Sequence, residues 1–317
     1  MYVVLFKRKI MKQRNCILQM WKLAIVGCLF FMVGCDDEKA LEATPYTEEM
    51  PFEFPQGKNQ WDREIQKIQE DMGVYIVYKD FQTKDLNRGW VIPRPQDIFV
   101  GEGLTDAQVP FYFNFVRDNL FRFLNKDFVR PILPKYFYLV NDLHVESNKE
   151  RKYDVSDKFD GLDFWAISFT DEKIEKLKDE DIKQRRNRMV YAVILKGLED
   201  GFVAEPAGFT DGVDYRKALS YYPTNADYFL NRGFVHYVKE DFTVESPIND
   251  IGVLTNKNAD FLCYVRQILF ETPEKFKAKY PQADYALINR RYQMVLNHFK
   301  KNYHLDLSAI ALGEPVE

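Results

Sequence analysis

The sequence predicts an α+β domain, with a small mixed sheet in its first half and mostly helices in its second half. Three apolar runs rich in aromatic and β-branched residues, at positions 74–78, 136–140 and 164–169, predict the strands. From about residue 179 onward, apolar residues recur mainly at helical spacing. Strands followed by helices, without a regular alternation of the two, are typical of α+β proteins and not of α/β proteins.

The N-terminus has the three parts of an export signal. Basic residues between positions 7 and 14 are followed by an apolar run at 23–33, which ends in Met32-Val33-Gly34-Cys35. The run is about half as long as the ~20 residues that a bilayer-spanning helix needs. Its end resembles a lipobox, in which the cysteine is acylated and becomes the first residue of the mature chain. We therefore expect a lipoprotein signal peptide at 1–34 and lipid on Cys35.

This segment leaves three alternatives. Cleavage before Cys28 is disfavoured because it would leave the apolar residues 29–33 exposed on the mature protein. A true start at Met11 would give a signal of more ordinary length. A single uncleaved anchoring helix is disfavoured because the run is short and charged residues follow it at once.

The expected lipid makes the membrane a partner of the chain. Each buried methylene contributes about 0.8 kcal/mol, and more than one acyl chain is needed for stable anchoring. Asp36-Asp37-Glu38 directly follows the cysteine and resembles the acidic signal that sends Bacteroidota lipoproteins to the cell surface; a solvated charge run is the alternative. We expect an outer-membrane, surface-facing protein with a flexible tether at 35–57 and a single domain at 58–317.

The helices are predicted from periodicity and from capping and breaking residues. The first helix of the domain carries Trp61, Ile65, Ile68 and Met72 at core spacing and ends at Gly73. Further helices are expected after the Thr105-x-x-Gln108 capping box, from about Asp179, from Thr224 to Gly233, from a cap at Asn258 and after Pro281, with a loop-like segment from Gly197 to Thr224.

Charge and cysteine content narrow the function classes. A formal net charge of -4 over 317 residues, without a basic stripe, disfavours nucleic acid as a partner. With Cys16 and Cys28 in the signal and Cys35 lipidated, only Cys263 remains in the domain, so no internal disulfide is expected. Cys263 lies in an apolar stretch, which predicts a buried thiol without a catalytic role.

The histidines form no recognisable zinc motif. A helical zinc site needs two histidines one turn apart, so that both rings reach one ion from one face. The chain contains His144, His236, His298 and His304, and no His-x-x-x-His. His236 and Glu240 could share a helix face, but a histidine at the edge of the core is the more common case. The sequence also lacks a Gly-x-Ser-x-Gly elbow and a phosphate loop.

A series of short motifs, taken in order along the chain, resembles a known family. The series comprises the lipobox with Asp36-Asp37, an early helix before Tyr75-Ile76-Val77-Tyr78, Phe128 through Pro134 before Tyr138-Leu139-Val140, Gly233-Phe234-Val235 with Tyr237, and Ala259-Asp260-Phe261. It is similar to the substrate-import-associated zinc metallohydrolase-type lipoproteins of Bacteroidota, a zinc-binding metallopeptidase family. The resemblance covers most of the mature chain. It implies a zincin-like metallopeptidase fold and a TonB-dependent importer of the SusC/SusD type as the partner.

The same resemblance implies a degenerate zinc motif. The family's zinc helix carries His-Glu-aromatic-small-His-aliphatic-Leu, and the matching stretch here is 189–195, where Tyr191 and Ala192 fit the pattern. Met189 and Val193 stand at the two histidine positions, and Val190 stands at the position of the general-base glutamate. With the HExxH motif lost, we expect no cofactor and no catalysis, since a fold does not fix an activity.

The preferred hypothesis is a non-catalytic surface lipoprotein that helps a SusC/SusD-type importer to capture a peptide or glycan. Aromatic rings stack on sugar faces and accept peptide side chains. The candidate contacts lie in the loop region and are Phe209, Tyr215, Tyr221, Tyr222 and Tyr228, each of which has buried packing as its alternative.

Two other hypotheses remain open. The first is an active zinc-dependent metallohydrolase or peptidase with an unrecognised metal site, to be sought at His236, Glu240 and Asp260. The second is a structural subunit that braces an outer-membrane assembly and binds no ligand of its own. An interface of that kind would present a contiguous exposed apolar patch.

Overall fold

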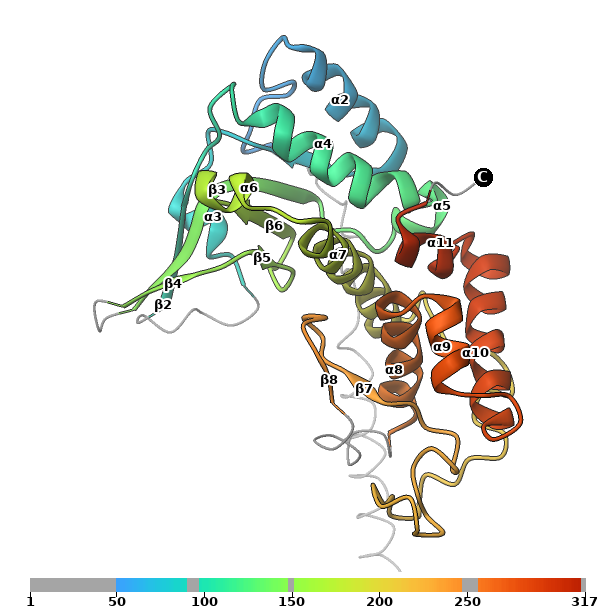
Figure 1. Cartoon of the computed structure of the whole chain (residues 1–317). Helices are drawn as coiled ribbons and strands as arrows, with labels where there is room; N and C mark the ends of the chain where they lie inside the picture. Colours follow the sequence, from blue (N-terminus) through green and yellow to red (C-terminus); the bar gives the residue numbers. More distant parts are fainter. Residues whose placement is uncertain (1–49, 90–96, 148–150, 247–255, 315–317) are drawn as a thin grey trace, which may run out of the picture. The chain divides into compact units, whose positions relative to one another are not determined.

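A mixed sheet forms the first half of the domain (Figure 1). The computed structural model describes residues 50–89, 97–147, 151–246 and 256–314. Within these ranges one sheet contains β1 (Tyr75–Val77), β2 (Asp97–Glu102), β3 (Tyr136–Ser147), β4 (Arg151–Asp154), β5 (Asp157–Lys158) and β6 (Phe164–Phe169). The strands β1, β3 and β6 run parallel, and β5 pairs antiparallel with β6. β2 and β4 pair antiparallel with the second half of β3.

Apolar side chains cover both faces of this sheet. Successive residues of a strand point to opposite faces, and along β3 Phe137 and Leu139 join the larger core, whereas Tyr136 and Tyr138 join a second one. The ring of Phe52 packs edge-on against both of these tyrosines. Burial on two faces explains why the strands are nearly continuous apolar runs and do not alternate with polar residues.

Helices make up most of the second half. The first half contains α2 (Gln60–Met72), α3 (Thr83–Leu86), α4 (Val109–Asn119), a 3-10 turn (Phe121–Phe123) and α5 (Lys126–Val129). The second half contains α6 (Asp171–Glu175), α7 (Asp179–Glu199), the short strands β7 (Tyr237–Val238) and β8 (Glu245–Ser246), α8 (Lys257–Phe270), α9 (Pro273–Lys279), α10 (Ala286–His298), a π-helical turn (Phe299–Tyr303) and α11 (Leu307–Leu312). α7 leads from the sheet into the helical half, where it packs against α8 and α11 (Figure 1). None of the helices within the described ranges is long and apolar enough to cross a membrane.

Helix α2 ends at Gly73, as its sequence predicts, and its start is capped by side-chain contacts. The backbone N–H of Asn59 donates to the carboxylate of Asp62 at 2.8 Å, which satisfies a group that the helix itself leaves unpaired. Gly73 ends the helix with a φ of 79°, a conformation that glycine adopts without strain. The hydroxyl of Tyr78 also donates to Asp62, at 2.7 Å, so the helix start is tied to the residue that follows β1.

A buried ion pair fastens the long loop between α7 and β7. Asp260 of α8 and Arg291 of α10 contact each other, and neither side chain is exposed to solvent. Arg291 donates to the carbonyl oxygens of Phe209 and Gly233 at 3.0 and 2.6 Å, and the hydroxyl of Tyr215 donates to Asp260 at 2.8 Å. Buried charges are tolerated when they are paired and hydrogen-bonded, so the pair anchors both ends of loop residues 209–233 to the helices.

The predicted class is confirmed, since strands come first and helices dominate afterwards. Each of the three predicted strands is present, although β3 extends seven residues beyond position 140, to Ser147. Cys263 is buried, as its apolar surroundings indicate. The signal peptide at 1–34, lipidation at Cys35 and the tether up to residue 49 lie outside the described residues.

Three expectations are wrong in detail. The tether does not extend to residue 57, because the side chain of Gln56 accepts from the N–H of Tyr78 at 2.9 Å and donates to the carbonyl of Lys79 at 2.6 Å. The segment from Thr224 to Gly233 forms successive turns and no helix. α8 is capped by Asn256, whose side chain accepts from two backbone N–H groups, and so it begins before Asn258.

Candidate functional site

The positions where the family resemblance would place zinc chemistry are buried in the core. Met189 is 2% exposed, and Val190 and Val193 are not exposed at all. All three join the large core cluster, which α8 and α11 also enter. A thioether is a weak ligand for zinc, and alkyl groups can neither bind a metal nor take a proton from water. The residues present at these positions therefore do not fit a zinc ion. The alignment that assigns them to the motif remains a prediction.

The other candidate metal ligands, His236, Glu240 and Asp260, each contact a different partner. Asp260 pairs with Arg291, and the carboxylate of Glu240 lies 3.5 Å from Arg266. The ring Nδ1 of His236 lies 2.7 Å from the hydroxyl of Tyr280. Among the described residues, no group of three or more His, Cys, Asp or Glu side chains could hold a metal ion.

His236 itself is held as a neutral ring. Burial lowers its pKa to about 4, because desolvation disfavours the charged imidazolium, and the nearby Lys279 ammonium lowers it further. The backbone N–H of His236 also donates to the hydroxyl of Tyr280, at 3.0 Å. Two contacts with one tyrosine indicate that this histidine positions the start of β7.

Three of the five candidate aromatic contacts serve packing. Phe209 has no exposed surface, so the expectation that it touches a ligand is wrong; the guanidinium of Arg291 covers its ring at 3.9 Å. Tyr215 and Tyr228 are partly buried and pack against the large core. Tyr221 and Tyr222 are exposed, with ring centroids 4.3 Å apart and hydroxyls 3.1 Å apart. Only these two remain available as a stacking surface.

The structure reveals a polar cleft that the sequence did not indicate. It has a volume of about 610 Å³ and is lined by Asp154, Ser156, Thr170, Glu172, Lys173, Lys176, Leu177, Asp181, Gln184, Arg185 and Arg188. These residues come from the end of β4, the residue before β5, α6 with the residues that flank it, and the first half of α7. Ligand pockets typically measure about 300–1,000 Å³, so this cleft is large enough for a peptide segment or a short oligosaccharide.

Most charges of this cleft are neutralised in pairs. Lys173 contacts Asp154 at 3.1 Å and Lys176 contacts Glu172 at 2.6 Å. The guanidinium of Arg188 lies 2.5 Å from the carboxylate of Asp157, which is 8% exposed. A cleft with alternating paired charges and few apolar groups favours a polar ligand over an apolar one.

Arg185 differs from the other basic residues of the cleft. One of its N–H groups donates to the carbonyl of Ser168 at 2.8 Å, and its guanidinium lies 3.9 Å from the ring centroid of Phe169. Burial lowers the pKa of Arg185, because desolvation disfavours the cation, and the neighbouring Arg188 lowers it further. The group still remains protonated at neutral pH, since the pKa of arginine begins above about 12.

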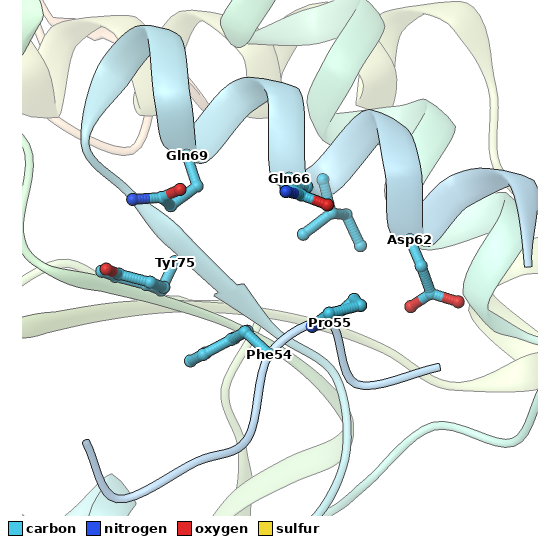
Figure 2. Close-up of a pocket in the computed structure, with 7 residues that line it drawn as sticks. Phe54, Pro55, Asp62, Gln66, Gln69 and Tyr75 are labelled. Carbon is cyan, nitrogen blue, oxygen red and sulfur yellow. The ribbon is translucent and has the colours of Figure 1, made fainter. Parts of the chain in front are cut away.

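A second pocket lies beside α2 (Figure 2). Phe54 and Tyr75 form one side, with ring centroids 4.8 Å apart, and the amides of Gln66 and Gln69 project from the helix on the other side. Asp62 also lines it, but both carboxylate oxygens are already bonded, to Asn59 and Tyr78. The volume of about 170 Å³ is below the usual range for ligand pockets. The cleft on α7 is therefore the stronger candidate.

Only a faint signal in the sequence could have indicated this cleft. Arg185 and Arg188 are three residues apart, so they share one helix face. Their partners Ser168, Phe169 and Asp157 belong to β6 and β5, and the sequence alone does not show that these elements meet.

Comparison with known proteins adds a distant likeness to a solved structure. No family model matches the chain. No curated protein matches it either. A solved structure from Bacteroides caccae, described as "a putative zinc-binding metallo-peptidase", superposes with a TM-score of 0.41 at 11% identity, over 81% of this chain and 92% of that chain. A likeness at this score carries no argument about the fold or the activity of this chain.

Proposed function

We propose that this chain is a surface-anchored, non-catalytic lipoprotein that captures a peptide or glycan for a TonB-dependent importer of the SusC/SusD type. The observation that carries the proposal is the division of α7 into two parts. Residues of its first half line a polar cleft of about 610 Å³, whereas Met189, Val190 and Val193 in its second half are buried. A helix divided in this way offers a binding surface without the imidazoles and carboxylate that zinc hydrolysis needs.

The proposal includes a zincin-like fold whose catalytic motif has been replaced by core residues. The order of elements supports it: a mixed sheet with an antiparallel edge strand precedes a long helix, and that helix contains the stretch that resembles the zinc motif. Buried apolar side chains at 189, 190 and 193 stabilise a helix that no longer has to present ligands to a metal.

Anchoring through Cys35 at the outer membrane, facing outward, completes the proposal. Its support is the lipobox and the acidic residues that follow it in the sequence. Anchoring holds the cleft near an importer in the same membrane, so that a captured ligand remains at a high effective concentration.

The test is to isolate the full-length chain from its native cells in mild detergent after brief crosslinking. The expected result is recovery together with a TonB-dependent barrel and a SusD-like protein, and cleavage of the domain by protease added to intact cells. Peptide and oligosaccharide pools incubated with the purified chain stay intact. Recovery of the chain alone, protection from external protease, or steady hydrolysis of either pool would each contradict the proposal.

A further inference from the structure

The basic residues that line the cleft on α7 are not equivalent. Lys173, Lys176 and Arg188 each contact a carboxylate within 4 Å. Arg185 has no such contact among the residues that the structure describes. The carboxylates of Asp157 and Asp181 are near enough to interact with Arg185 electrostatically, but Asp157 is hydrogen-bonded to Arg188 and Asp181 accepts from the backbone N–H of Lys178. Arg185 is thus the cation whose charge the described part of the cleft leaves without a direct partner.

The position of Arg185 is fixed by the end of β6. Its guanidinium lies over the ring of Phe169, and one N–H is donated to Ser168. The backbone of Phe169 is held in turn by Tyr112, whose hydroxyl donates to the carbonyl at 2.8 Å and accepts from the N–H at 3.1 Å. Because the cation is already held in place, a ligand does not have to immobilise a long side chain when it binds.

Arg185 has more N–H donors than the described residues accept. Arginine carries five N–H groups arranged in a planar fork that matches a carboxylate. Within the described residues, one of the five N–H groups of Arg185 is accepted, by the carbonyl oxygen of Ser168. The remaining donors belong to a side chain that lines an open cleft of about 610 Å³.

We propose that Arg185 anchors a carboxylate group of the ligand captured in the cleft on α7. The proposal rests on the proposed capture function and names the chemistry of its ligand. Asp154, Glu172 and Asp181 line the same cleft, so a multiply charged anion such as phosphate would meet more repulsion there than a single carboxylate, which can accept from the remaining donors of Arg185. Two kinds of ligand carry such a group: a peptide with a free C-terminus and an oligosaccharide with a uronic acid.

The experiment measures binding of defined probes to the full-length chain in detergent micelles by isothermal titration calorimetry. The peptide probes are pooled acetylated tetrapeptides with a free carboxylate and the same pool with C-terminal amides. The sugar probes are digalacturonate and the neutral digalactose. The variants are Arg185→Gln, Arg185→Lys and, as the matched control, Lys196→Gln, because Lys196 is also a cation of α7 but pairs with Asp200 and does not line the cleft.

The expected result is that one acidic probe binds and its neutral counterpart binds at least tenfold more weakly, since hydrogen bonds to charged groups are the stronger ones. Arg185→Gln lowers affinity for the acidic probe at least tenfold, and Arg185→Lys lowers it less because a charge remains without the fork. Lys196→Gln changes the affinity less than about twofold. Preference for the acidic peptide or for the uronate identifies the source of the carboxylate, and either preference supports the anchor. Thermal unfolding confirms that each variant is folded, and Arg185→Lys keeps the test valid if the glutamine variant is not.

Two results would overturn the anchor and leave the capture function standing. One is equal affinity for acidic and neutral probes; the other is unchanged affinity in both Arg185 variants. Failure of all four probes to bind, while the chain still co-purifies with an importer, would also overturn the anchor alone. Loss of that co-purification is the separate result that overturns the capture function.

Discussion

Removing the carboxylate of Asp260 is expected to destabilise the domain strongly. Asp260→Ala leaves the cation of Arg291 in a site where neither side chain is exposed. Breaking a buried ion pair by removing one partner costs about 3–5 kcal/mol, because the remaining charge is uncompensated. The loss of the hydrogen bond from Tyr215 adds about 1 kcal/mol. The sum is a large fraction of the roughly 5–15 kcal/mol by which whole domains are stable.

The free energy of unfolding is measured by urea denaturation followed by circular dichroism, and hydrogen exchange follows loop residues 209–233. We predict a loss of about 4 kcal/mol or more, with faster exchange in the loop, because Arg291 holds the carbonyls of Phe209 and Gly233. Asp200→Ala is the matched control; it breaks a partly exposed pair with Lys196 and costs less than about 1 kcal/mol. A loss below about 1 kcal/mol for Asp260→Ala would show that the buried pair of Asp260 and Arg291 does not hold the fold together.

Two further predictions concern pH and the buried half of α7. The pKa of His236 is about 4 in the folded chain against 6.5 for an ordinary histidine, so the unfolded chain takes up the proton first as the pH falls. The stabilising contribution of the neutral ring is therefore fully present above about pH 6.5. The free energy of unfolding falls by on the order of 2–3 kcal/mol toward pH 4. Urea titrations at several pH values measure this loss, which His236→Gln should remove; an unchanged slope in that variant contradicts the assignment. Val190→Glu should lower the free energy of unfolding by at least about 3 kcal/mol, because it places a carboxylate at a position with no exposure. Val190→Ala should cost less, and equal stability of the two variants would show that this part of α7 is open to solvent.

Much of the fold follows from local patterns. The runs at 74–78, 136–140 and 164–169 are strands because they are long, apolar and rich in β-branched and aromatic residues, and the sheet buries them on both faces. The pattern fails for β4 and β5, which are short and polar, and for β2, whose apolar run is only three residues long. β2 and β4 pair with the extension of β3, and β5 pairs with β6 at the edge of the sheet. Such strands depend on their neighbours more than on their own composition.

The site could be predicted only in part. Met189, Val190 and Val193 are apolar in the sequence and buried in the structure, as expected of a core helix, and their place in a lost zinc motif stays a prediction. Phe209 could not be placed, because its glycine- and proline-rich surroundings suggest an exposed loop, whereas Arg291, about 80 residues later, covers its ring. The partly buried position of Arg185 beside the cleft likewise depends on its contacts with Ser168 and Phe169 of β6.

The most direct test of a non-catalytic function is the zinc content of the full-length chain, purified in detergent with zinc present throughout. Elemental analysis per mole of protein gives the answer without any assumption about a substrate. We predict no stoichiometric zinc, because Met189, Val190 and Val193 offer neither imidazole nor carboxylate and Asp260 is committed to Arg291. One zinc ion per chain would contradict the account, and the search for its ligands would begin at His236.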